Sequence, residues 1–161
     1  MRTYTYYFAE ITLLLTCCLT SAAQATAQTV VQLSAAEKQL LDATNQERAN
    51  AKLPPLRPSA ALCQAARGHS ANMAKQQKMD HVLDGKDPFR RIHDTGYSFL
   101  TAGENIAYGF DSTEEVMRVW MNSPGHRRNI LNPAYTEIGL ARVNDAQGVP
   151  YYTQVFGTPA P

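Results

Sequence analysis

The spacing of hydrophobic residues predicts that helices fill most of the chain before residue 124. Ser34 and Glu37 form a capping box, a serine at a helix start followed three residues later by a glutamate that reaches back to it. Apolar side chains within residues 40–51 then recur near one face at helical spacing. We expect this first helix to end before Pro54-Pro55, because a residue that precedes proline is disfavoured in helical conformation.

Three further helices follow from the same pattern. Ser59 opens the second, over residues 59–79, whose apolar stripe is rich in alanine and allows a close neighbour. Asp87-Pro88 begins a short third helix, since proline suits the first helical turn. A second capping box at residues 112–115 begins the fourth, and Pro124-Gly125 is expected to break it.

The last quarter of the chain changes period. Residues 138–143 and 151–156 read as two β-rich strands separated by a turn at residues 144–148. Earlier, the stretch TAGENIAYG, residues 101–109, is interpreted as irregular because it contains glycine near both ends. Helices followed by a β-hairpin predict an α+β fold in which helices cover an antiparallel sheet.

Composition then bounds the size and the partners of the protein. The 161 residues, 44% hydrophobic and 18% charged, suit one compact domain. A formal net charge of +1 provides no basic patch or stripe of the kind that binds nucleic acid. Two tight basic pairs, Arg90-Arg91 and Arg127-Arg128, are interpreted as solvated surface or structural ion pairs.

The N-terminus predicts export. A basic Arg2, a short apolar run over residues 11–19 and Ala25-Thr26-Ala27 match a secretory signal cleaved after residue 27. The apolar run is too short to span a bilayer as a helix, so the mature form should have no membrane span. The expected location is therefore extracellular or periplasmic. An uncleaved anchor, or a lipoprotein attached through Cys17 or Cys18, is the weaker alternative.

Loss of the signal leaves a single cysteine, Cys63. One cysteine cannot form an internal disulfide, although an exported protein would meet conditions that allow one. Because Cys63 lies among alanine and leucine in the second helix, it is interpreted as a small buried hydrophobic residue and not as a nucleophile.

Four histidines and one glutamate are the candidates for chemistry. His69 lies on an apolar helix stripe and is expected to be a core residue satisfied by a hydrogen bond, and His93 is expected at the surface. His81 and His126 each follow a helix, in loops of the kind that often carry binding residues. Glu104 lies in a segment of apolar and small residues, where a carboxylate needs a partner.

Two arrangements of these residues are open. His81, His126 and Glu104 could hold a divalent metal such as zinc, with a fourth position left for water. The same groups could form a hydrogen-bonded polar cluster that contains no metal. The common signatures H-E-x-x-H, G-x-S-x-G and C-x-x-C, and a phosphate-binding loop, do not occur in the sequence.

Five stretches together resemble the CAP superfamily of cysteine-rich secretory, antigen 5 and pathogenesis-related 1 proteins, and in particular the cysteine-poor, SCP-like domains that bacteria export. They occur in the family's order over roughly residues 40–157: NQERANAKLPPL, LCQAARGHSANMA, GENIAYG, VWMNSPGHRRNILNPAYTEIGLA and YYTQVFG. The resemblance implies a three-layer α-β-α sandwich. Around this domain we place the signal at residues 1–27, a leader with the start of the first helix at 28–39, and a tail at 158–161.

The resemblance also implies a cleft. Eukaryotic members line it with two histidines and two glutamates. Here the matches are His81, the Glu104 of GEN, and His126, which precedes Gly139 by thirteen residues as in the family. The second glutamate is missing, because Ser123 stands at its position, three residues after Trp120. Loss of that carboxylate weakens any mechanism that needs a glutamate pair.

Three functions are consistent with these residues. The favoured one is a non-enzymatic exported module that binds a lipid, a glycan or a protein in the cleft, with or without a divalent metal. The alternative is a peptidase-like hydrolase in which His126 or Glu104 acts as a general base on water, directly or through a metal. The third is a structural role in which the cleft only supports the fold.

Overall fold

The computed structural model describes residues 31–161, so the predicted signal, residues 1–27, lies outside the described part. The elements are α1 (Ala35–Asn50), β1 (Arg57–Pro58), α2 (Ala60–Gln76), α3 (Pro88–Asp94), β2 (Phe99–Tyr108), α4 (Thr113–Asn122), α5 (Pro124–Ile130), β3 (Glu137–Asn144) and β4 (Pro150–Pro159). Within residues 31–161, no helix has the length and apolar character needed to cross a membrane.

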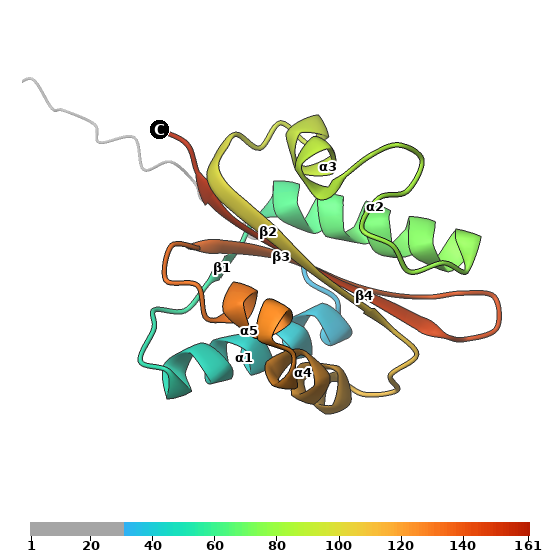
Figure 1. Cartoon of the computed structure of the whole chain (residues 1–161), viewed down its shortest axis with the longest axis horizontal. Coiled ribbons are helices and arrows are strands. Elements are labelled where there is room, and N and C mark those ends of the chain that lie inside the picture. The colour runs from blue at the N-terminus through green and yellow to red at the C-terminus, as the bar shows by residue number, and fades with distance from the viewer. Residues whose placement is uncertain (1–30) are drawn as a thin grey trace, which may run out of the picture.

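The elements form three layers. The central sheet has the strand order β1-β3-β4-β2, with β2 at one edge. Helices α2 and α3 lie on one face of the sheet, and α1, α4 and α5 lie on the other (Figure 1). The predicted α+β sandwich is confirmed. The sheet is mixed and not wholly antiparallel, because the two-residue strand β1 pairs parallel with β3.

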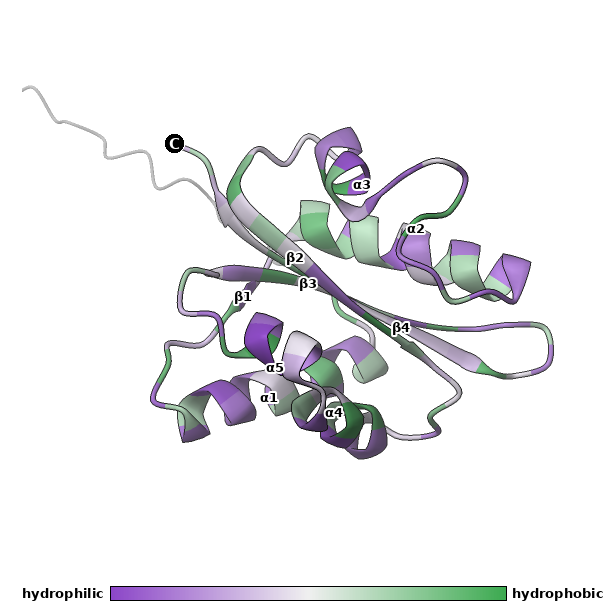
Figure 2. Ribbon diagram, in the orientation of Figure 1, coloured by the Kyte–Doolittle hydropathy of each residue, from purple (hydrophilic) through white to green (hydrophobic). Residues whose placement is uncertain are grey.

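Each face of the sheet has its own hydrophobic core. Leu140 and Phe156 point to the face of α4, where Trp120 is fully buried. Their neighbours in sequence, Ala141 and Val155, point to the face of α2. This alternation follows from the period of two along a strand. The covering helices α1, α2 and α4 carry both hydrophobic and hydrophilic segments (Figure 2), as expected of helices with one buried face.

Local signals predicted several boundaries correctly. In the capping box of α1, the Glu37 N–H donates to Ser34 Oγ at 3.2 Å and the Ser34 N–H donates to Glu37 Oε2 at 2.8 Å. Asp87 caps α3 by accepting from the Arg90 N–H at 2.7 Å. The predicted hairpin is also confirmed, with β3 and β4 paired from Glu137–Gly157 to Asn144–Pro150.

Two predictions about the middle of the chain are wrong. Residues 101–109 are not irregular, since residues 99–108 form β2, which pairs with β4 along almost its whole length. Pro124-Gly125 ends α4 but does not lead into a loop, because Pro124 is the first residue of α5. Proline lacks the N–H that the first helical turn leaves unpaired anyway, so it can begin a helix as readily as it ends one.

Candidate functional site

The Glu104 carboxylate is the centre of a buried polar cluster on the edge strand β2. Its side chain is 2% exposed and lies on the face of the sheet that α2 and α3 cover. Oε1 lies 2.8 Å from His81 Nδ1, and Oε2 accepts from Arg91 Nη2 at 2.7 Å. Because an ionised carboxylate only accepts hydrogen bonds, the His81 proton sits on Nδ1 and leaves Nε2 as an acceptor in the neutral ring.

Arg91 ties helix α3 to the segment that carries His81. Besides its bond to Glu104, the guanidinium donates through Nη1 to the carbonyls of His81 at 2.9 Å and Lys86 at 2.8 Å. The Arg91 side chain is only 11% exposed, whereas its neighbour Arg90 forms an exposed pair with Asp94. Arg91 is therefore part of a buried structural ion pair, which the sequence pattern could not distinguish from that of Arg90.

His69 adds a second imidazole to this cluster, from α2. It is fully buried, and its Nε2 lies 3.8 Å from Glu104 Oε1, too far for a hydrogen bond. Neither ring nitrogen has a hydrogen-bond partner among the described residues. The expected hydrogen bond that would satisfy His69 is therefore not found.

Burial sets the protonation of His69. Loss of hydration lowers the pKa of its imidazole to about 4, and the nearby Arg91 charge acts in the same direction. The Glu104 carboxylate opposes this decrease but does not offset the burial. His69 is thus neutral in the folded protein at pH 7.

Acidification should therefore destabilise the protein partly through His69. An unfolded histidine has a pKa near 6.5, so between about pH 6.5 and 4 the unfolded chain binds a proton that the folded one does not. The contribution of His69 to the free energy of unfolding is unchanged above this window and falls by about 3 kcal/mol across it. Urea unfolding of wild type and His69→Gln at pH 7 and 4.5 should show a smaller loss in the variant. Equal losses would contradict a buried neutral His69.

His126 lies on the other side of the β2 edge. The sequence predicted a loop here, but His126 belongs to the first turn of α5. Its ring faces Trp120, with the ring centroids 6.4 Å apart, and its Nδ1 is buried without a hydrogen-bond partner among residues 31–161. Burial lowers the pKa of His126, and the proximity of His81 lowers it further.

A set of amide side chains fixes α5 against β2. Asn129 Nδ2 donates to the Glu104 carbonyl at 3.1 Å and to Asn105 Oδ1 at 2.9 Å. Asn105 Nδ2 in turn donates to Gln154 Oε1 at 3.1 Å and to the His126 carbonyl at 3.2 Å. Neighbouring residues of β2 thus hold the two sides of the site: Glu104 binds His81, and Asn105 holds His126.

Ser123 lies at the junction between α4 and α5. It ends the first helix and precedes the second, and its side chain makes no capping hydrogen bond to α5. Its N–H donates to the Trp120 carbonyl at 3.1 Å. The residue in the position of the missing glutamate is thus a partly exposed helix boundary.

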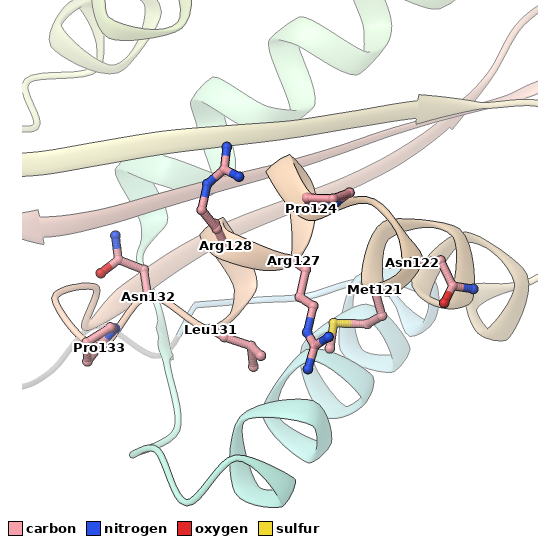
Figure 3. Close-up of a pocket in the computed structure, with 8 residues that line it drawn as sticks. All are labelled: Met121, Asn122, Pro124, Arg127, Arg128, Leu131, Asn132 and Pro133. Atoms are coloured by element: carbon pink, nitrogen blue, oxygen red, sulfur yellow. The ribbon is translucent and has the colours of Figure 1, made fainter.

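A separate groove is lined by the end of α4, by α5 and by the segment that follows α5 (Figure 3). Its volume is about 600 Å³, and its lining includes Met121, Arg127, Arg128 and Leu131. In Figure 3 the Arg127 side chain extends towards Met121, whereas Arg128 extends the other way. His81, Glu104 and His126 do not line this groove. The sequence pattern contained no sign of it.

The described residues do not fit the zinc site considered for His81, Glu104 and His126. Both Glu104 oxygens already accept hydrogen bonds, one from an imidazole and one from a guanidinium. No group of three His, Cys, Asp or Glu side chains within residues 31–161 is arranged to hold a metal ion. A metal at Glu104 would also lie beside the positive charge of Arg91, which opposes binding.

Comparison with known proteins places the chain in a family. Residues 41–156 match the family model described as CAP, the cysteine-rich secretory protein family. The uncharacterized protein YkwD of Bacillus subtilis is 42% identical over 125 residues, which are 77% of this chain and 48% of YkwD. The chain thus spans about half of the length of that relative.

Solved structures agree. An extracellular, SCP-domain-containing protein of Bacillus anthracis is 30% identical with a TM-score of 0.68, over 75% of this chain and 39% of that one. An outer surface protein of Borrelia burgdorferi shares the fold, with a TM-score of 0.75 and 24% identity over 81% of this chain and 97% of that one. The match of sequence model and fold over most of the chain shows that it belongs to the CAP family of cysteine-rich secretory proteins.

Proposed function

We propose that the chain is an exported, non-enzymatic binding domain that recognises a glycan at the edge of β2, between His81 and His126. Export is supported by the predicted signal at residues 1–27 and by two similar proteins, one named as extracellular and one as an outer surface protein. The choice of ligand rests on the hydrogen-bonding capacity of the two imidazoles.

The observation that carries the proposal is the orientation of His81 by Glu104. With its Nδ1 bound to the carboxylate, the ring presents Nε2 as an acceptor, and its side chain is 48% exposed, so a ligand can reach it. Met79 and Val82, on either side of His81 in sequence, are 43% and 49% exposed. An exposed acceptor in a segment that also exposes apolar side chains suits a ligand that has both hydroxyl groups and apolar ring faces.

His126 strengthens the preference for a ligand with hydroxyl groups. A buried polar atom without a partner costs about 1–3 kcal/mol, and the Nδ1 of His126 has none among the described residues. Because this atom is buried, a ligand can reach the His126 ring only at Nε2, which can form a hydrogen bond with a hydroxyl group. An alkyl chain of a lipid would leave the Nε2 atoms of His81 and His126 without a hydrogen-bond partner, so a glycan is favoured over a lipid here.

The same geometry disfavours Glu104 as the general base of a hydrolase. A general base must come within hydrogen-bond reach of the water that it activates. The Glu104 side chain is 2% exposed, and both of its oxygens accept from other side chains, which leaves it no route to a substrate water. In this proposal Glu104 orients His81 and does not take part in chemistry.

Isothermal titration of the purified protein with soluble glycan fragments of bacterial cell wall tests the proposal. We expect His81→Ala and His126→Ala each to weaken binding about tenfold or more, because each removes one hydrogen bond to the ligand. His93→Ala is the matched control, since His93 is an exposed histidine on α3. Failure of the fragments to bind, or an equal loss with His93→Ala, would contradict the proposal.

A further inference from the structure

We propose that the Arg91 guanidinium takes the place of a divalent cation at the Glu104 carboxylate, so that a charge built into the chain excludes metal ions from this site. The inference concerns which ions the cluster can accept. It does not depend on whether a glycan binds nearby.

Both oxygens of the Glu104 carboxylate are already occupied. Arg91 Nη2 lies 2.7 Å from Oε2, and His81 Nδ1 lies 2.8 Å from Oε1, so each oxygen has a donor. Arg91 and Glu104 side chains are 11% and 2% exposed, so solvent screens this pair weakly. A metal ion bound to either oxygen would stand close to a fixed positive charge in a poorly hydrated place.

Arg91 is also held in place by other hydrogen bonds. Its Nη1 also donates to the carbonyls of His81 and Lys86, at 2.9 and 2.8 Å. Releasing Glu104 to a metal would therefore strain or break a planar, forked set of hydrogen bonds that also holds the His81 segment in place. A lysine in this position would supply the charge but not the fork.

The remaining groups around Glu104 have the chemistry of metal ligands. The nitrogens of His69 and His81 lie 3.8 and 2.8 Å from the same carboxylate oxygen. Both nitrogens of His69 are buried and have no hydrogen-bond partner within the described part of the chain. Imidazole and carboxylate groups are zinc ligands. With Arg91 in place these side chains are not arranged to hold an ion, and we expect removal of the guanidinium to let them close on zinc.

The experiment titrates zinc into the full chain and into three single variants, by calorimetry and by metal analysis after dialysis. Arg91→Gln removes the charge, Arg91→Lys keeps it, and Arg90→Gln is the control, because Arg90 pairs with Asp94 at the surface. We expect Arg91→Gln to bind zinc at least tenfold more tightly than wild type. Arg91→Lys and Arg90→Gln should bind as wild type does. Circular dichroism establishes that each variant is folded.

A histidine variant locates the ion. Adding His81→Gln to Arg91→Gln should abolish the gain, whereas His81→Gln alone should leave the zinc affinity of wild type unchanged. The inference is overturned if His81→Gln alone weakens zinc binding, since the site would then hold metal despite Arg91. It is also overturned if folded Arg91→Gln binds zinc no more tightly than wild type. Should Arg91→Gln not fold, the comparison of wild type with His81→Gln alone decides.

Discussion

Gly139→Ala should abolish folding. A Cβ built on Gly139 would lie 2.0 Å from the carbonyl carbon of Leu62, 2.1 Å from its oxygen and 2.4 Å from the Cys63 nitrogen. These are backbone atoms of α2, so no side chain can rotate away to make room. Helix α2 would have to move away from β3 at this contact. The expected loss exceeds the whole stability of an ordinary domain, roughly 5–15 kcal/mol.

Gly68→Ala is the matched control for this experiment. Gly68 lies in α2, the helix that Gly139 contacts, but a Cβ on Gly68 would meet no atom within 4 Å. Alanine is a better helix former than glycine, so this variant should gain about 0.5–1 kcal/mol. Thermal unfolding followed by circular dichroism distinguishes the two. A Gly139→Ala protein that melts within a few degrees of wild type would show that α2 and β3 are not in this contact.

Arg48→Met should cause the next largest loss. Arg48 is 1% exposed, and no carboxylate pairs with it within the described residues. Backbone carbonyls satisfy its guanidinium instead: it donates to those of Pro54, Ile130 and Asn132 at 2.9 Å each and to that of Tyr135 at 3.3 Å. One side chain of α1 thereby holds both the segment after α1 and the connection between α5 and β3.

Methionine matches the apolar stem of Arg48 but leaves these carbonyls without their donor. Since hydrogen bonds to a charged group contribute about 1.5–3 kcal/mol each, the expected loss is at least roughly 4 kcal/mol. Arg118→Met is the control, because the Arg118 side chain is 66% exposed on α4. Urea unfolding of the two variants gives the comparison. An unchanged midpoint for Arg48→Met would mean that water reaches these carbonyls.

Helix starts and the final hairpin could be predicted because their signals are local. A capping box such as Ser34 with Glu37 needs only residues three apart, and it appears in the structure as expected. The hairpin of β3 and β4 joins strands that are adjacent in sequence across a short turn. Such features depend little on distant parts of the chain.

Strand β2 escaped prediction because both of its faces are buried. Alternation of apolar and polar residues marks a strand with one face in water. In β2 the residues 104–107 are buried in succession, with Glu104 turned towards α2 and α3 and Asn105 towards α5. Two polar side chains therefore occupy buried positions, each satisfied by residues distant in sequence. A pattern based on hydrophobicity could not distinguish such a strand from a loop.

The candidate site could be predicted in part for the same reason. That a buried Glu104 needs a hydrogen-bond partner follows from its apolar neighbours, and His81 is such a partner in the structure. Arg91 and His69 reach the same carboxylate from α3 and α2, and only the packing of those helices brings them together. One of two adjacent arginines is buried and the other exposed, a difference that depends on helix orientation and not on local sequence.

The most direct test of the binding site is the imidazole ¹⁵N spectrum of the protein during titration with the glycan fragments. Before ligand is added, His81 should show a protonated Nδ1, as its bond to Glu104 requires. On titration, the ring signals of His81 and His126 should shift while those of His69 and His93 stay in place. Ring signals of His81 and His126 that both stay in place while the fragments bind would contradict the account.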